Sequence, residues 1–258
     1  MKFNKSAQGT GNIYHQPVWL TQEQGFTYAA AGIQGGTSAG AFTLNSAVPA
    51  LMQDAQITGT QLVLRSQIDY ETLARAGNTK ASFGEMSKVL VENMTQAVAK
   101  RLEIMFLYGR GPTGVGTISA GTVGSAGVDA TLTVNTAQWA PGLWAGMEGA
   151  AVSLNVLTGT YPSQSQTRRQ AAAATTNGAI IRSINYSTRV LSCSDTYAAL
   201  ATAAIFVTPT AGDVIFLFGT IANAAGPAAI SYNESIGLDG ITTQTTGSLF
   251  NINLATYS

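Results

Sequence analysis

The sequence carries little charge. Only 10% of its 258 residues are charged, and 13 Lys and Arg balance 13 Asp and Glu to a formal net charge of zero. An ordinary soluble domain has about 25% charged residues. Because a strong net charge is what attracts polyanions over long distances, we do not expect this chain to capture DNA or an anionic membrane through its overall field.

Cysteine and histidine occur once each, as Cys193 and His15. One cysteine excludes an internal disulfide, and two such residues are too few for a zinc site of Cys and His ligands. Cys193 ends the run Val190-Leu191-Ser192-Cys193, where a small buried side chain is the expected role. The sequence therefore predicts no metal and no cofactor.

Long apolar runs are also absent. No stretch of about 20 apolar residues is present, and no apolar segment follows the lysines of Met1-Lys2-Phe3-Asn4-Lys5, so we expect neither a membrane span nor a signal peptide and place the chain in a cytoplasm. The 45% hydrophobic share argues against disorder. Sparse charge at zero net charge favours a chain buried partly against copies of itself, and a plain neutral monomer is the alternative.

The first 76 residues contain two kinds of segment. Residues 1–40 are polar and Gly-rich with scattered aromatics, which predicts either an arm that becomes ordered on another surface or a flexible tail. Residues 41–76 have β-branched residues and partial alternation, which indicates extended structure. Charged side chains cluster there, either on a solvated strand face or as ion pairs to a neighbour: Arg65, Asp69, Glu71 and Arg75.

Residues 82–108 predict a long amphipathic helix. Ser82 and Glu85 have capping-box spacing, and Gly109 supplies a stop. Apolar residues recur at spacings of three or four, at Met86, Val89, Leu90, Met94, Ala97, Val98, Leu102 and Met105. We expect a sheet to cover this stripe.

Residues 114–222 alternate between strand and turn patterns. Strands are predicted at 131–134, 150–154, 178–184, 189–192 and 212–219. The polar stretch 161–176, with Arg168 and Arg169, predicts a hairpin tip, and its 171–174 alanine run could instead form a helical turn.

Catalytic patterns are weak. The letters Gly109 to Gly114 match G-x-G-x-x-G, but this stretch follows a helix and opens a strand region, the reverse of a dinucleotide-binding turn. His15 lies outside any nucleophile pattern. Asp69 and Glu71 lie beside arginines that should keep both ionised, and Asp239 sits in a glycine turn. We therefore expect no enzyme.

The order of segments resembles the major capsid protein of tailed bacteriophages, the HK97-type fold. The resemblance covers nearly the whole chain: an N-terminal arm (1–40), an E-loop (41–81) returning through Gln67-Ile68-Asp69-Tyr70-Glu71-Thr72-Leu73-Ala74-Arg75-Ala76, a spine helix (82–109) and a strand-rich P-domain (110–258). Residues 146–222 are similar to a small β insertion of some members, and residues 236–257 are similar to the strands before the axial A-domain. The A-domain is not present in the sequence, so the chain is either a part of a longer subunit, which we expect, or a member that lacks this domain.

The resemblance implies an α+β, HK97-like fold and a structural protein without catalysis. It implies self-assembly into hexamers and pentamers of an icosahedral head around double-stranded DNA, in the virion capsid after assembly in the host cytoplasm. Its implied partners are copies of itself, portal, scaffold and decoration proteins, and non-specifically packaged DNA, with no membrane. Expected contact residues between subunits are Arg65, Asp69, Tyr70, Glu71 and Arg75, and Arg168 and Arg169 either contact DNA or belong to a solvated loop. The alternatives are an encapsulin-like protein compartment and a standalone β-rich binding or tail protein.

Overall fold

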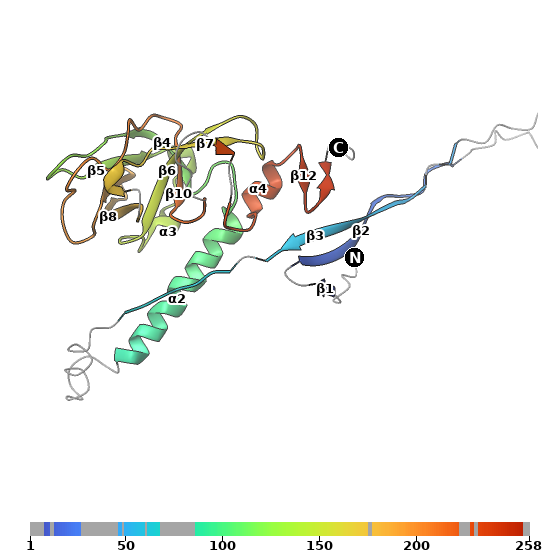
Figure 1. Ribbon diagram of the computed structural model, residues 1–258, viewed down its shortest axis with the longest axis horizontal. Helices are drawn as coiled ribbons and strands as arrows, with labels where there is room; N and C mark the ends of the chain where they lie inside the picture. The colour runs from blue at the N-terminus through green and yellow to red at the C-terminus, as the bar shows by residue number, and fades with distance from the viewer. Residues whose placement is uncertain are drawn as a thin grey trace, which may run out of the picture. The chain divides into compact units, whose positions relative to one another are not determined.

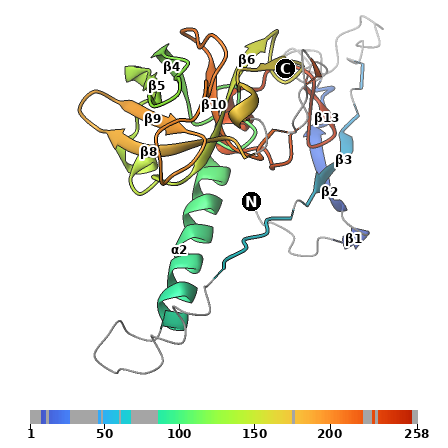
Figure 2. The ribbon, with the colours of Figure 1, turned by 60° about the vertical axis from the view of Figure 1, so that its left-hand side comes forward.

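The computed structural model describes residues 8–10, 13–26, 46–47, 49–59, 61–67, 86–174, 177–221, 228–229 and 232–254. The chain divides into two compact units (Figures 1 and 2). We call residues 60–244 the barrel unit, and residues 1–59 with 245–258 the sheet unit. Among the described residues, Ala55 is the one buried apolar side chain of the sheet unit, and all the others belong to the barrel unit.

Six antiparallel strands of the barrel unit close into a ring. Their order is β10 (Val214–Leu217), β4 (Gly116–Gly121), β5 (Ala130–Val134), β9 (Val190–Ser194), β8 (Ala179–Asn185) and β6 (Ala151–Thr158), and β6 pairs in turn with β10. The closing pair runs from Val214 opposite Asn155 to Leu217 opposite Val152. Closure gives every strand of the ring two neighbours, which removes open edges. Outside the ring, β7 (Ser165–Arg168) pairs with β6, and β11 (Ala228–Ala229) pairs with β7.

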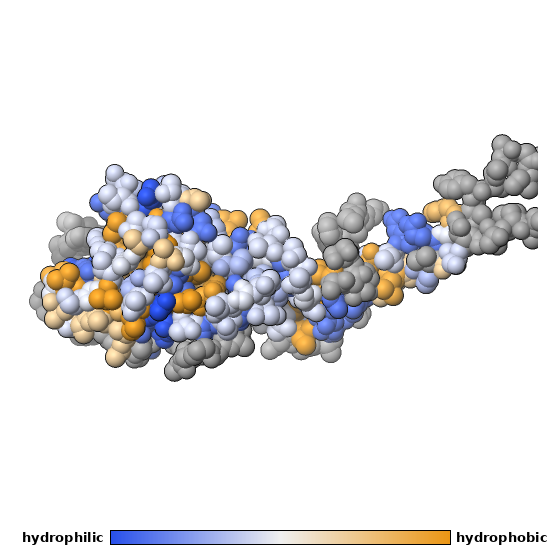
Figure 3. All heavy atoms as spheres, turned by 90° about the horizontal axis from the view of Figure 1, so that it is seen from above, coloured by the Kyte–Doolittle hydropathy of each residue, from blue (hydrophilic) through white to orange (hydrophobic). Residues whose placement is uncertain are grey.

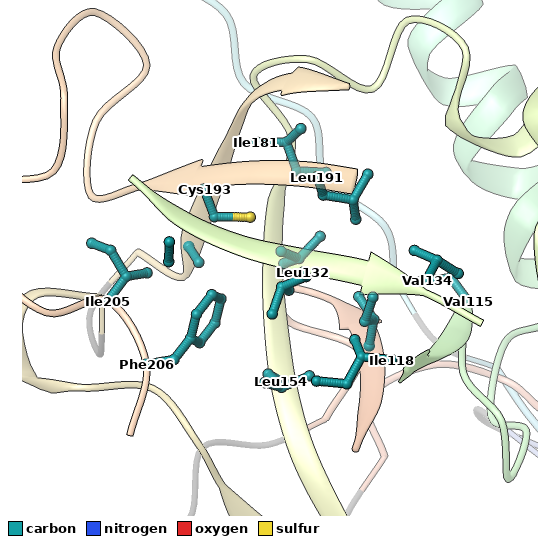
Figure 4. Close-up of a cluster of buried hydrophobic side chains, with 14 of the residues drawn as sticks. Val115, Ile118, Leu132, Val134, Leu154, Ile181, Leu191, Cys193, Ile205 and Phe206 are labelled. Atoms are coloured by element: carbon teal, nitrogen blue, oxygen red, sulfur yellow. The ribbon is translucent and has the colours of Figure 1, made fainter. Parts of the chain in front are cut away.

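The barrel interior is a packed hydrophobic core. Alternate residues of β5 are buried, namely Ala130, Leu132 and Val134, as expected for a strand with one face inward. Figure 4 shows side chains from several strands of the ring gathered between them. Ile205 and Phe206, from the loop before β10, belong to the same cluster. The filled interior provides most of the apolar burial that stabilises this unit.

This closed barrel overturns the expected HK97-type fold. The five predicted strands are present as β5, β6, β8, β9 and β10. The error lies in their arrangement, because the strands of the predicted 146–222 insertion share one ring with β4 and β5 instead of forming a small separate sheet. Periodicity along the chain reports which face of a strand is buried, but it does not report which distant strand becomes its partner.

The predicted helix is present as α2 (Met86–Leu107). The sheet that we expected over its apolar stripe is not present within the described residues. Of the described side chains from Lys88 to Leu107, only Ile104 is buried, and Val89 and Ala97 of the predicted stripe are exposed. The helix therefore meets the rest of its unit mainly near its C-terminal end (Figure 2) and is not a rod laid along a sheet. The proposed capping box of Ser82 and Glu85 lies outside the described residues.

The remaining helical elements are short. They are α3 (Pro141–Trp144), α4 (Leu238–Thr243) and the 3₁₀ turns η1 (Thr136–Gln138) and η2 (Ala172–Ala174). The η2 turn corresponds to the helical alternative for the 171–174 run. A strand-rich unit with a closed barrel and little helix is what the described residues form, and it does not match the layout expected from the resemblance.

The end of α2 is fixed by a close backbone crossing. A Cβ on Gly109 would lie 2.4 Å from the Met105 carbonyl oxygen and 2.7 Å from that of Ser235. The Arg110 amide donates to the same Ser235 carbonyl at 3.1 Å. Only glycine permits this approach, so the stretch Gly109 to Gly114 is a helix stop leading toward β4, as the sequence indicated, and not a phosphate-binding turn.

The sheet unit is small. Its strands β1 (Gln8–Thr10), β2 (Ile13–Thr21) and β3 (Leu51–Thr58) form one antiparallel sheet in that order. A hairpin of β12 (Ser248–Leu249) and β13 (Ile252–Asn253) meets β3, where the Gln56 amide donates to the Phe250 carbonyl at 2.9 Å. The flexible-tail prediction for residues 1–40 is wrong for β2, because β2 forms its backbone hydrogen bonds with β3, a strand distant in the sequence.

Candidate functional site

The described residues hold no group of three or more His, Cys, Asp or Glu side chains that could bind a metal ion. Cys193 is fully buried in the barrel core, and burial, with a smaller effect of Asp129, raises the pKa of its thiol to about 12. A thiol in this state is neither ionised nor accessible at neutral pH, so it is not a nucleophile.

Two ion pairs of the barrel unit join segments that are distant in the sequence. Arg182 of β8 contacts Asp129 with 2.6 Å between its Nη1 and Oδ2, and Asp129 also accepts from the Ala201 amide at 3.1 Å. Arg169 Nε lies 3.3 Å from Asp213 Oδ2. Each pair bridges segments far apart in the sequence, which is a structural use of charge.

Arg168 and Arg169 lie at the end of β7. Arg168 Nε donates to Gln170 Oε1 at 2.6 Å, its guanidinium packs over the Phe218 ring at 5.2 Å, and desolvation lowers its pKa. Arg169 contacts Asp213 and donates to Thr210 Oγ1 at 3.1 Å. Both guanidinium groups have neighbours within the barrel unit, and a DNA contact by either stays a prediction.

The predicted contact residues between subunits are only partly described. Arg65 lies in the exposed extended segment 61–67, and no ion pair of Arg65 is present within the described residues. Asp69, Tyr70, Glu71 and Arg75 lie outside the described residues. The proposed ion pairs of this segment therefore stay predictions.

The sheet unit exposes large apolar side chains on both of its faces. Residues directly opposite each other on antiparallel strands share a face. Trp19 is opposite Met52, and Tyr14 is opposite Ile57 on the other face. Their exposed fractions are 67% for Trp19, 54% for Met52, 52% for Tyr14 and 50% for Ile57. We call these four side chains the apolar ribbon.

The apolar ribbon lacks a core of its own. A small isolated sheet is marginally stable in water unless a hydrophobic face is covered. Here the described part of the unit buries only Ala55. Large apolar side chains that stay exposed on both faces of a sheet mark an interaction site, and Figure 3 shows hydrophobic residues on the surface of both units. The ribbon is therefore the candidate functional site of the sheet unit.

The backbone edges of β2 and β3 are less available for pairing with another strand than the two faces of the sheet are for side-chain contact. Pro17 within β2 has no amide hydrogen to donate. On β3, the Gln56 amide is taken by Phe250, and Asn251 Nδ2 donates to the Asp54 carbonyl at 3.4 Å. Contact through the side chains of the faces is thus favoured over addition of another strand.

His15 has a structural partner on the same face as Trp19. Its Nδ1 lies 2.5 Å from Asp54 Oδ2, and Gln56 Nε2 donates to the same oxygen at 3.3 Å. The hydrogen bond with His15 is the main cause that lowers the pKa of Asp54, and desolvation opposes it. The pair joins β2 to β3, and no nucleophile accompanies it among the described residues.

Sequence reasoning did not find the ribbon. Tyr14 and Trp19 are among the scattered aromatics of residues 1–40, and Met52 belongs to no pattern that predicts a site. The signal that could have found them is the apolar character of both odd and even positions from Ile13 to Leu20, which is unusual for a surface strand with one buried face.

Within the described residues, none of the helices has the length and apolarity needed to cross a bilayer. No family model, no curated protein and no solved structure matches this chain.

Proposed function

We propose that this chain is a structural subunit that assembles with copies of itself, and that the assembly is the head shell of a tailed bacteriophage around double-stranded DNA. The observation that carries the proposal is the apolar ribbon, which exposes four large apolar side chains in a unit that buries only Ala55. The proposal does not depend on the HK97-type fold. Its phage-head part comes from the resemblance of the sequence alone, and the barrel does not support it.

Covering the apolar ribbon would supply substantial binding free energy. Full burial of a large apolar side chain is worth about 1.5–3 kcal/mol. About half of each of the four side chains is still exposed, so covering the pair on one face gives about 1.5–3 kcal/mol, and covering both faces gives about 3–6 kcal/mol. In a closed assembly every copy makes this contact repeatedly, and repeated weak contacts add up to a stable particle.

The charge composition supports association between identical chains. With 13 basic and 13 acidic residues, copies do not repel one another through net charge. The same neutrality gives the chain no polycationic character, so contact with packaged DNA would be local and weak.

The test is electron microscopy and light scattering of the purified chain. The proposal expects particles in the megadalton range, and a single species of 26.7 kDa would refute self-assembly. Nuclease-protected double-stranded DNA inside the particles supports a phage head. Particles that enclose protein without DNA support the encapsulin-like compartment instead.

One observation favours a second candidate, a standalone β-rich binding or tail protein. The barrel unit has a complete hydrophobic core and a closed ring of strands, so it does not need a neighbour to be stable. This candidate predicts a monomer at all concentrations, which the same light-scattering experiment measures.

A further inference from the structure

A groove runs beside the C-terminal half of α2 in the barrel unit. Two neighbouring hollows, of about 320 Å³ and about 370 Å³, share Lys100 and Ile104 as wall residues. The first also has Leu107 and Leu143 in its wall, and the second has Ala97 and Phe218. The Lys100 ammonium donates to the Ala145 carbonyl, so this side chain crosses between the two hollows.

The groove has apolar walls and an excess of negative charge. Arg101 is paired with Glu234 and donates to Thr220 Oγ1 at 3.2 Å. Glu103 lines the first hollow and Glu148 the second; both are exposed, and neither has an ion-pair partner within the described residues. Counted together, Lys100, Arg101, Glu103, Glu148 and Glu234 leave one negative charge in excess.

One exposed segment of the chain has the complementary character. Leu62, Val63 and Leu64 have exposed fractions of 48%, 83% and 43%, and Arg65 follows them. In an extended chain, Leu62 and Leu64 point to the same side, and Val63 and Arg65 point to the other. The two leucines match the two hollows, and the long, flexible Arg65 side chain matches the exposed carboxylates at the rim of the groove.

The lengths also agree. The α2 wall of the groove extends from Ala97 to Leu107, which is about 15 Å at about 1.5 Å per residue. The four extended residues Leu62–Arg65 cover about 13 Å at about 3.3 Å each, so they fit along this wall. In the same chain both leucines remain about half exposed, so they do not fill their own groove.

We propose that Leu62–Arg65 of a second copy docks in the groove beside α2, with one leucine in each hollow and Arg65 paired to Glu103 or Glu148. This inference rests on the proposed function, because it names a contact through which copies associate. The side chain of Val63 faces away from the groove.

The test is cross-linking between two singly substituted full-length chains, mixed and treated with the thiol oxidant diamide. One chain carries Leu62→Cys or Leu64→Cys, and the other carries Ala97→Cys or Leu107→Cys. Because the two thiols lie on different chains, any disulfide between them joins two copies. Cys193 is fully buried and does not compete.

Matched controls use exposed apolar positions next to the proposed contact. Val63→Cys replaces Leu62→Cys on the segment, and Val91→Cys, which lines neither hollow and is 60% exposed, replaces Ala97→Cys on α2. The proposal expects each leucine position to cross-link at least tenfold faster than both controls. Equal rates for Val63→Cys, or no cross-link at either leucine, would overturn it.

A charge exchange tests the role of Arg65. Arg65→Glu should reduce the cross-linking rate at Leu64→Cys about tenfold, and either Glu103→Arg or Glu148→Arg should restore it. Restoration by neither variant refutes the placement of Arg65. Particle formation is measured separately. Particles without the cross-link would refute the groove contact alone. Specific cross-links without particles would support the groove contact and refute the proposed shell.

Discussion

Replacement of Trp19 by serine should impair assembly without unfolding the subunit. About two-thirds of the side chain is exposed in the isolated chain, and a tryptophan side chain can bury about 200 Å². Covering the exposed part, about 130 Å², at about 25 cal/mol per Å² is worth about 3 kcal/mol. Since about 1.4 kcal/mol is a factor of ten in an equilibrium constant, loss of Trp19 should weaken each contact about 100-fold.

The assay is the protein concentration at which light scattering first reports particles, measured for the unsubstituted chain and for Trp19→Ser. The matched control is Tyr197→Ser, because Tyr197 is 56% exposed but belongs to the barrel unit. The threshold should rise strongly for Trp19→Ser and little for Tyr197→Ser. Thermal unfolding of both variants should stay within about 0.5 kcal/mol of the unsubstituted chain. An unchanged threshold for Trp19→Ser refutes the reasoning from the apolar ribbon.

Three further predictions follow from the described contacts. The His15 hydrogen bond holds the pKa of Asp54 below its ordinary value of 3.8. This pair therefore stabilises the sheet unit above pH 3.8, and its contribution is lost as the pH falls through the lowered pKa. NMR titration of Asp54 should show the lowered pKa in the unsubstituted chain and an ordinary pKa in His15→Gln. The buried Cys193 thiol should not react with a thiol reagent at pH 8 until denaturant is added, and rapid reaction of the folded chain would contradict its place in the core. Asp129→Asn removes the ion pair with Arg182 and should lower the free energy of unfolding by about 1–2 kcal/mol in thermal denaturation, with no comparable loss in a variant of exposed Glu103.

Local elements were read well from the sequence, and their assembly was not. The helix at α2, the five predicted strands and the stop at Gly109 follow from apolar spacing and from glycine, which act over a few residues. The cover of α2 was inferred from its stripe, and the structure buries only Ile104 there. A stripe shows that a helix could be covered, but whether another element reaches it depends on the path of the whole chain.

The candidate site shows the same division. Composition alone determined that the chain is neutral, has no disulfide and has no Cys and His zinc site. The position of Trp19 opposite Met52, and of Tyr14 opposite Ile57, was decided by the register between β2 and β3, which are separated by about 30 residues. The pairing of β6 with β10, which closes the barrel, likewise depends on the tertiary structure. Which strands pair depends on the apolar surface that all the strands bury together. This total burial depends on the whole folded chain, so it cannot be read from one segment of the sequence.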